Sequence, residues 1–246
     1  MLEGLYSAAA GMAAQQQAID GVANDLANVN TTGYKSVRVG FRDLIYNPQG
    51  PPAGPTVSAG AGAAASIIGR SQEQGALRTT DQPLDVAISG PGFIQVRQPD
   101  GTPALTRDGS LRVDSLGRIG TADGDLLDPP IQVPANTSID RVGISRNGTV
   151  TVNGGRAIGR IQLVTVASSD GLQPLGSNRF AVTAASGAAG AAGAATTLIQ
   201  GHLEGSNVDM SSAMTDMMTA QRGYEMTSRV IQMQDDMMSI ANGVKK

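Results

Sequence analysis

The chain has 246 residues, a net charge of −3, no cysteine and one histidine, and aromatic residues make up only 3% of it. The lack of cysteine excludes disulfides and thiolate metal sites, and the lack of long basic runs argues against nucleic acid or an anionic membrane as a partner. No run of about 18 apolar residues could span a bilayer, and the N-terminus lacks the basic start of a secretory signal. If the protein leaves the cytoplasm, we expect it to do so with its N-terminus uncleaved.

The first 30 residues predict a helix with one apolar seam. The seam positions alternate at spacings of three and four, as in a coiled coil, with a single polar member at Gln15. They are Leu5, Ala8, Met12, Gln15, Ile19, Val22, Leu26 and Val29. No proline interrupts this pattern, and Asn28, Asn30 and Gly33 supply stop signals. We therefore expect a helix that ends near residue 30.

The middle of the chain is typical of β structure. Short runs containing Ile and Val, such as Val142–Ser145, Thr149–Val152 and Ile158–Val166, are separated by closely spaced turn signals. The turn signals are Asp100-Gly101, Asp108-Gly109, Leu116-Gly117, Asp123-Gly124, Asn147-Gly148 and Gly154-Gly155. Two low-complexity stretches, Pro48–Ala65 and Ala184–Ala195, indicate extended or loop segments. The pattern predicts an antiparallel domain of many short strands.

A long second helix is predicted at the C-terminus, with Asp209 or Ser211 as its N-cap, a start near Met210 and Gly243 as its terminator. It carries two apolar stripes on different faces. One comprises Met226, Val230, Met233, Met237, Ile240 and Val244, and the other comprises Met210, Met214, Met217, Gln221, Tyr224, Ile231 and Met238. A helix that is apolar on two faces needs two partners. One would be the N-terminal helix and the other would come from elsewhere, and the sequence leaves open which stripe meets which.

Together these elements predict an α+β fold. Paired, coiled-coil-like N- and C-terminal helices would flank an inserted antiparallel β domain of many short strands. We expect residues 1–34 and 208–246 to form the helical domain. Residues 35–83 would be an extended connection, and residues 84–207 would be the β domain, with an Ala/Gly-rich loop at 184–195.

Catalytic chemistry finds little support in the sequence. His202 has no cysteine with which to bind a metal, and a catalytic role would need positioned partners. Asp235 and Asp236 are adjacent on a helix, so their side chains point about 100° apart and cannot act as a glycosidase pair. Gly90-Pro91-Gly92 lacks the ending of a phosphate-binding loop. We expect no enzymatic activity and no catalytic residue, metal or cofactor.

A recognisable motif spans the end of the first predicted helix. Residues 24–35 read Asn-Asp-Leu-Ala-Asn-Val-Asn-Thr-Thr-Gly-Tyr-Lys, which resembles the signature of the bacterial flagellar rod and hook proteins. The family usually has Asn where Asp25 stands. The matching residues are Asn24, Leu26, Ala27, Asn28, Asn30, Thr31, Gly33, Tyr34 and Lys35. Further matches, in the order that the family has them, are Ser7–Met12, Phe41–Leu44, Asp85–Ile88, Thr106–Gly109, Glu204–Val208 and Ala220–Glu225.

The resemblance implies a structural subunit of the flagellar rod, which is the drive shaft of the flagellum. It implies a hollow helical tube that transmits torque and lets exported subunits pass, with the paired terminal helices in its inner layer. The implied partners are copies of the chain itself, other rod and hook proteins, ring proteins around the rod and the flagellar type III export apparatus. The implied location is the basal body, outside the cytoplasm.

Within this family, the chain length and the segments Asp43–Tyr46 and Gly201–Asp209 are most similar to distal-rod members. The segment between Tyr46 and Asp85 is shorter than in typical distal-rod members, which leaves proximal-rod members as the alternative. A secreted glycan-binding β module is a second alternative, but it leaves the heptads at both termini unexplained. The residues that we expect at assembly contacts are Leu5, Met12, Ile19, Val22, Leu26, Met214, Met217, Tyr224, Val230, Ile231, Met233, Met237 and Ile240.

Overall fold

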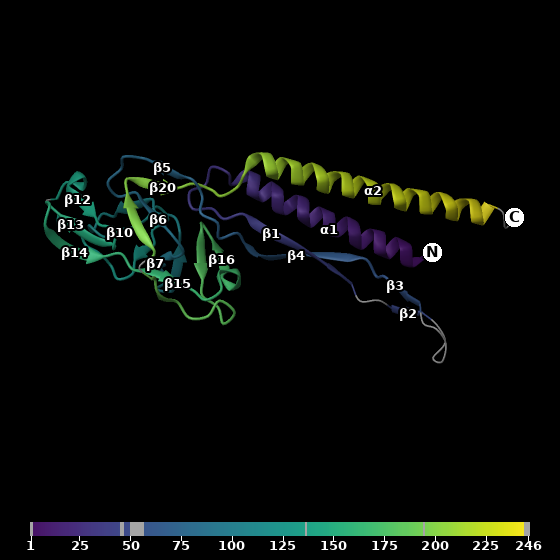
Figure 1. Cartoon of the computed structure of the whole chain (residues 1–246), viewed down its shortest axis with the longest axis horizontal. Helices are drawn as coiled ribbons and strands as arrows, with labels where there is room; N and C mark the ends of the chain where they lie inside the picture. Colours follow the sequence, from purple (N-terminus) through teal and green to yellow (C-terminus); the bar gives the residue numbers. More distant parts are fainter. Residues whose placement is uncertain (1, 45–46, 50–56, 136, 194, 244–246) are drawn as a thin grey trace. The chain divides into compact units, whose positions relative to one another are not determined.

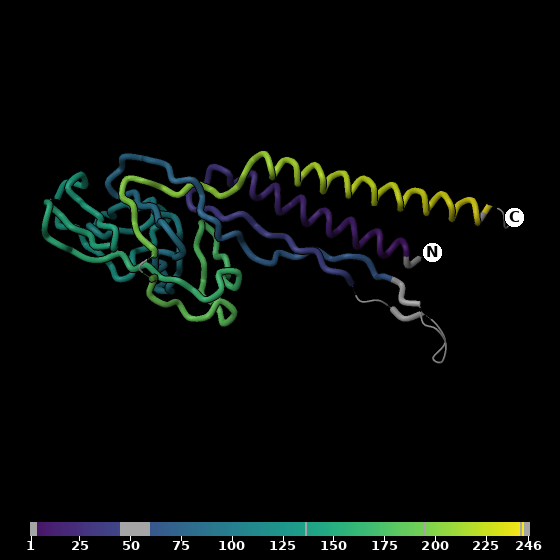
Figure 2. The backbone as a smooth tube through the Cα atoms, in the orientation of Figure 1, coloured from purple at the N-terminus to yellow at the C-terminus, as the bar shows by residue number. Residues whose placement is uncertain are grey.

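The structure is a computed structural model that describes residues 2–44, 47–49, 57–135, 137–193 and 195–243. It confirms the predicted α+β fold, with a helix at each end of the chain and many antiparallel strands between them (Figure 1). The chain forms two compact units. Unit 1 contains Met1–Ala27, Val37–Ile68 and Asp209–Lys246, and unit 2 contains Asn28–Ser36 and Gly69–Val208. The chain therefore passes from one unit to the other four times along the path traced in Figure 2.

Unit 1 is built on two long helices, α1 (Leu2–Ala27) and α2 (Met210–Gly243). They lie side by side and run antiparallel, because Gly4 near the start of α1 lies against Gln234 near the end of α2 (Figure 1). The pairing of the terminal helices, which the sequence predicts, is therefore present within one chain.

Small and polar residues take part in the contact between α1 and α2. A Cβ atom placed on Gly11 would lie 3.7 Å from Thr227, and one placed on Gly223 would lie 3.0 Å from the Gln15 side chain. Among the described residues of α2, the buried ones are Ala213 and Ala220. Such small residues let the two helices approach closely, but they bury little apolar surface.

The helix ends follow the predicted capping signals. The Asp209 Oδ1 atom accepts a hydrogen bond from the Ser212 backbone nitrogen at 2.7 Å, so Asp209 is the N-cap of α2. At the end of α1, the Thr31 backbone nitrogen donates to the Asn28 carbonyl at 3.1 Å and forms a turn. The helix ends at Ala27, before the last predicted seam position.

A narrow β ribbon lies against α1 in unit 1. A Cβ atom placed on Gly21 of α1 would lie 2.9 Å from the Val39 side chain. The paired strands of the ribbon are β1 (Val37–Asp43) with β4 (Ala63–Arg70), and β2 (Asn47–Gln49) with β3 (Val57–Ala59). These strands lie in the segment 35–83 that was expected to be an extended connection. Residues 50–56 of the Pro48–Ala65 stretch lie outside the described residues.

Unit 2 contains the remaining strands and two short 3₁₀ turns. The strands before residue 130 are β5 (Leu77–Thr79), β6 (Val86–Ser89), β7 (Phe93–Arg97), β8 (Pro103–Thr106), β9 (Leu111–Val113), β10 (Ile119–Thr121) and β11 (Leu126–Leu127). The later ones are β12 (Val142–Ile144), β13 (Thr149–Val152), β14 (Arg156–Arg160), β15 (Leu163–Thr165), β16 (Gln173–Gly176), β17 (Arg179–Ala181), β18 (Gly190–Ala191), β19 (Thr197–Gln200) and β20 (His202–Glu204). The 3₁₀ turns are η1 (Ile139–Arg141) and η2 (Ser169–Gly171).

Short antiparallel pairings join these strands. The main sheet has the order β16-β17-β8-β7-β11-β10-β9, and β15 pairs with both β7 and β18 beside it. The smaller sheets are β12-β13-β14, β19-β6 and β20-β5. Strand β20 pairs with β5 near the two ends of the long Gly69–Val208 segment, so this segment closes on itself.

Aliphatic side chains from several of these sheets form the core of unit 2. Its fully buried members include Val86, Ile88, Ile94, Val96, Ile119, Val150 and Leu198. A smaller cluster holds Phe93 and Phe180, whose rings meet edge to face at 5.8 Å. This apolar core therefore lies in unit 2, which contains the strands predicted after residue 84.

Two predicted segments differ from the structure in detail. The run Ile158–Val166, predicted as one strand, is divided between β14 and β15. The stretch Ala184–Ala195, predicted as a loop, contains the short strand β18, which pairs with β15. Strand pairing uses backbone groups, so a stretch of Ala and Gly can pair without any side-chain signal.

Candidate assembly surface

Helix α2 exposes nine large apolar side chains to solvent. Five of them follow one another at spacings of four and three residues, and we refer to these as the C-terminal stripe. The C-terminal stripe comprises Met226, Val230, Met233, Met237 and Ile240, with exposed fractions from 45% to 66%. The spacing is that of the a and d positions of a coiled coil. A coiled-coil seam that nothing in the described part of the chain covers is a surface suited to another helix.

A second exposed group lies nearer the start of α2. This N-terminal stripe comprises Met210, Met214 and Met218, which are about half exposed. At about 100° per residue, the N-terminal stripe lies roughly 120° around the helix from the side that faces α1. The C-terminal stripe lies roughly 120° from the α1 side in the opposite direction. Helix α2 therefore has three distinct faces, and α1 covers one of them.

The structure divides the predicted assembly residues of α2 among these faces. Met217 and Ile231 are half-buried on the side of α2 that carries Ala220 and Thr227. Tyr224, which was predicted on the same seam, is exposed. The exposed members of the predicted set are Met214, Tyr224, Val230, Met233, Met237 and Ile240. The predicted α1 members, which are half-buried, are Leu5, Met12, Ile19, Val22 and Leu26.

The signature residues at the end of the motif are more buried than those at its start. Asn24, Ala27 and Asn30 are exposed, and the half-buried members are Leu26, Asn28 and Thr31. Gly33, Tyr34 and Lys35 are buried. Gly33 has a φ of +66°, which favours glycine, and its backbone nitrogen donates to the Glu204 carbonyl at 2.8 Å. The end of the signature is thus part of the interior of unit 2.

The most buried charge of the signature is held in an ion cluster of three residues. The Lys35 Nζ atom lies 2.6 Å from Glu204 Oε1, and the Arg107 Nε atom lies 3.0 Å from Glu204 Oε2. All three side chains have at most 2% of their surface exposed. Burial, together with the positive charge of Arg107, lowers the pKa of Lys35 below its ordinary value, although Glu204 acts in the opposite direction. The motifs that contain Arg107 and Glu204 belong to the family resemblance, but no pattern in the sequence predicts this cluster.

Asp25, the residue that departs from the usual signature, is also buried. Its two carboxylate oxygens accept hydrogen bonds from the Val37 backbone nitrogen at 3.0 Å and 3.2 Å. The side chain thereby ties the last turns of α1 to the first residue of β1. An Asn side chain could present one carbonyl oxygen in the same place, so either residue type can make this contact.

We expect Asp25→Asn to change the free energy of unfolding of the helical unit by less than about 1 kcal/mol, because one acceptor oxygen remains. Asp25→Ala removes both oxygens and should cost about 1–3 kcal/mol, since the partly buried Val37 nitrogen loses this acceptor. Urea unfolding followed by the helical circular dichroism signal measures both changes. Equal damage from the two substitutions would contradict this role for Asp25.

The groups considered for catalysis are engaged in ordinary contacts. His202 has its Nδ1 atom 3.0 Å from the Gln200 carbonyl and its Nε2 atom 3.2 Å from Thr79 Oγ1. Asp235 and Asp236 are exposed on α2. Among the residues that the structure describes, no three His, Cys, Asp or Glu side chains are grouped so that they could hold a metal ion. No helix in the described part of the chain is long and apolar enough to cross a membrane.

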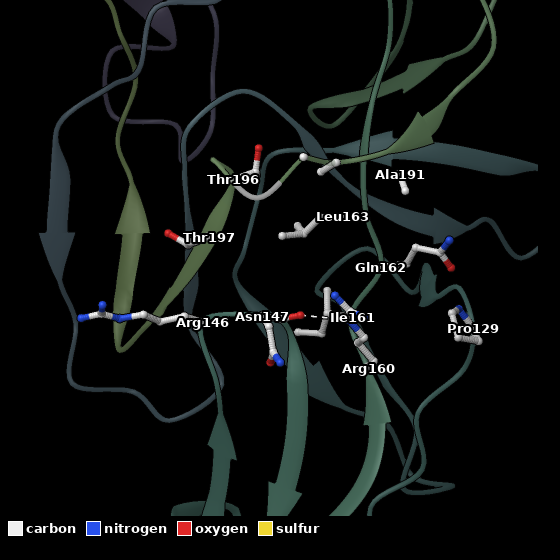
Figure 3. Close-up of a pocket in the computed structure, with 12 residues that line it drawn as sticks. Pro129, Arg146, Asn147, Arg160, Ile161, Gln162, Leu163, Ala191, Thr196 and Thr197 are labelled. Carbon is white, nitrogen blue, oxygen red and sulfur yellow. Dashed lines mark hydrogen bonds between the residues drawn. The ribbon is translucent and has the colours of Figure 1, made fainter.

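A cavity of about 680 Å³ opens in unit 2 (Figure 3). Arg146 and Arg160 stand on one side of it, and Thr196 and Thr197 stand near the other. Arg160 Nε donates to the Asn147 carbonyl at 2.9 Å. The lining residues that the structure describes include no carboxylate and no imidazole, so the cavity lacks the paired acid and base of a hydrolytic site.

Three protein-family descriptions match the chain at positions that agree with this architecture. "Flagella basal body rod protein" matches residues 5–35, "Flagellar hook protein FlgE/F/G D1 domain" matches residues 87–152, and "Flagellar basal body rod FlgEFG protein C-terminal" matches residues 199–244. The chain is 40% identical to the flagellar basal-body rod protein FlgG of Borreliella burgdorferi, over the full length of both chains. The chain belongs to the flagellar basal-body rod protein family. The resemblance inferred from residues 24–35 is therefore confirmed.

Other relatives extend the comparison. FlgG of Caulobacter vibrioides is 38% identical over 99% of this chain and 100% of its own length. The flagellar hook-basal body complex protein FlhP of Bacillus subtilis is 32% identical over the full length of both chains. As a member of this family the protein is a structural component, and the matches cover most of α1 and all of α2, the helix that presents the candidate assembly surface.

Proposed function

We propose that the protein is a structural subunit of the distal flagellar rod, which polymerises into a hollow helical tube that transmits torque. The observation that carries this proposal is the C-terminal stripe of α2, a coiled-coil seam that the described residues leave uncovered. The FlgG names of relatives matched over their full length support the distal rod in particular. The alternative within the family is a proximal-rod subunit.

The exposed stripes supply the energy for assembly. Each large apolar side chain of the C-terminal stripe would gain roughly 1 kcal/mol when a neighbour covers its exposed half, so the five together would gain about 5 kcal/mol per subunit. The N-terminal stripe lies on a different face of α2 and would meet a different neighbour. Contacts on two faces that do not close on themselves extend into a filament.

The same proposal names the partners and the location. The neighbours that cover α2 are copies of this chain within the rod and related rod or hook subunits at its ends. Ring proteins around the rod and the flagellar type III export apparatus are further partners in this proposal. The subunit would be exported with its N-terminus retained, would act outside the cytoplasm in the basal body, and would have no enzymatic activity.

Locating the chain in purified basal bodies tests the proposal. The turn at Gly154 and Gly155, between β13 and β14, is exposed and has open space around it, so an epitope inserted there should be tolerated. Immunogold labelling of hook–basal bodies is expected to mark the distal part of the rod, with an untagged strain as the control. Label on the proximal part would favour the alternative. Tagged chains that support swimming but leave basal bodies unlabelled would exclude a rod subunit.

A further inference from the structure

Three chain segments that border the passages between the units are bonded to one another inside unit 2. We call residues 33–36, 70–76 and 204–207 the clamp. The Gly33 nitrogen donates to the Glu204 carbonyl at 2.8 Å, the Ser71 nitrogen to the Ser36 carbonyl at 2.9 Å, and the Gly205 nitrogen to the Ala76 carbonyl at 2.8 Å. Each segment of the clamp is therefore hydrogen-bonded through its backbone to both of the others.

The side chain of Asn207 links all three segments of the clamp. Its Oδ1 atom accepts a hydrogen bond from the Ser36 nitrogen at 2.8 Å. Its Nδ2 atom donates to the Ser71 carbonyl at 3.3 Å and to the Glu73 carbonyl at 3.1 Å. One amide group thus uses both its acceptor and its donor to hold two segments against the third.

The buried ion cluster forms the interior of the clamp. Lys35 Nζ donates to the Glu73 carbonyl at 2.6 Å as well as to Glu204, and Glu204 Oε1 also accepts from the Gly75 nitrogen at 3.0 Å. The Arg70 guanidinium donates to the Lys35 carbonyl at 2.9 Å. The charged groups therefore cross-link the same three segments that the backbone joins.

The segments of the clamp lie beside the points where the chain enters or leaves unit 2. Residue 36 is the last residue before one passage to unit 1, residue 69 is the first after another, and residue 208 is the last before a third. The remaining passage lies between residues 27 and 28, and residues 28–36, which follow it, lead directly into the clamp. Every covalent connection between the units is thus continuous with a segment of the clamp.

From this coincidence we infer that the clamp is a load-sharing junction, in which a force on any one passage is distributed over all three segments. Without cross-links, a pulled segment would separate from its neighbours one hydrogen bond at a time. Because Asn207 and the Lys35–Glu204 pair hold each segment to the others, the segments open together as one cooperative unit. The physical property belongs to the single chain, and its use in transmitting torque rests on the proposed rod function.

Native-state hydrogen exchange of Asn207→Ala tests this cooperativity. The amides of Gly33 and Gly205 do not bond to Asn207, yet a shared opening predicts that their exchange and that of the Ser71 amide accelerate by a common factor of about ten or more. Asn147→Ala is the matched control. It removes an acceptor of the Thr149 nitrogen in the β13 turn, and it should change the clamp amides less than about twofold, as expected for an independently opening region.

Unchanged exchange at Gly33 and Gly205 in folded Asn207→Ala would show that the segments open independently and would overturn the inference. If Asn207→Ala does not fold, Arg70→Gln removes the bond to the Lys35 carbonyl and the contact of the guanidinium with the Tyr34 ring, 5.3 Å away, and it is expected to accelerate the same amides together. A second measurement separates the inference from the proposed function. Flagella built with Asn207→Ala should detach at lower shear in viscous medium than those built with Asn147→Ala. If the amides accelerate together in the monomer but the shear that detaches flagella is unchanged, the inference of a load-sharing junction stands and the result counts against the rod role.

Discussion

Met237→Asp is expected to block assembly of the subunit while leaving the isolated chain folded. Met237 is 57% exposed, so its replacement should change the free energy of unfolding of the monomer by no more than about 0.5 kcal/mol. In an assembled rod the same carboxylate would lie in a covered apolar seam. An unpaired buried charge costs several kcal/mol, which corresponds to a loss of at least about a hundredfold in affinity.

Two matched substitutions make this expectation specific to the C-terminal stripe. Gln232→Asp adds the same charge to an exposed position about 140° around the helix from Met237 and more than three turns beyond Met218, the last member of the N-terminal stripe, and it should leave assembly intact. Met217→Asp changes a half-buried residue on the α1 side and should lower the stability of the helix pair by about 1–3 kcal/mol in the monomer itself. Sedimentation and electron microscopy measure assembly, and circular dichroism measures the monomer. Normal rods from Met237→Asp would show that the C-terminal stripe is not a contact.

The spacing of large apolar residues revealed the C-terminal stripe from the sequence, but it revealed only part of the face of α2 that meets α1. Beside Met217 and Ile231 of the second predicted stripe, that face carries Gly223, Thr227 and Gln234, which give no hydrophobic signal. The structure places neither predicted seam as a whole against α1. A periodicity analysis detects a continuous apolar seam, whereas contacts made by glycine and by short polar side chains are visible only when both helices are in place.

The ion cluster was out of reach of sequence analysis for a different reason. Lys35 and Glu204 are separated by 169 positions, and no local pattern indicates that they meet. Charged residues are almost never fully buried unless they are paired, so the default interpretation of each residue is an exposed side chain. The resemblance did identify the motifs that contain Lys35, Arg107 and Glu204. It could not indicate that these motifs form one structure.

The same limit applies to the segment expected to be an extended connection. Strand β1 alternates Val and Phe with Arg and Gly, whereas β4 shows no alternation, and neither strand has a fully buried side chain among the residues described. Pairing through the backbone makes these strands regular, and the contact of Gly21 with Val39 positions β1 against α1. Short ribbons of this kind depend on a neighbouring surface, which local composition does not encode.

The buried ion cluster gives the second large expected effect, which is an asymmetry between its members. Glu204→Gln keeps the size of the side chain but leaves Lys35 and Arg107 as two like charges in the interior, so it should cost about 3–5 kcal/mol of unfolding free energy. Lys35→Met leaves the Glu204–Arg107 pair neutral and removes mainly two hydrogen bonds, so it should cost about 1–3 kcal/mol. Adding Lys35→Met to Glu204→Gln should restore part of the lost stability, because one of the two uncompensated cations is removed.

The dependence of this asymmetry on pH follows from the Lys35 amine. Its pKa is already lowered by burial and by Arg107, and Glu204 is one of the groups that raise it, so Glu204→Gln should lower it further. A lysine whose pKa is lower in the folded state binds fewer protons there than in the unfolded state. Stability therefore rises with pH between that lowered value and the ordinary value of 10.5. Urea unfolding of both proteins across this range should show the deficit of Glu204→Gln shrinking as the pH increases.

Arg97→Gln, which breaks a half-exposed pair with Asp128, should cost at most about 1 kcal/mol, and no such pH dependence is expected for it. A deficit that grows with pH, or a Lys35→Met variant less stable than Glu204→Gln, would show that Glu204 does not compensate two buried cations.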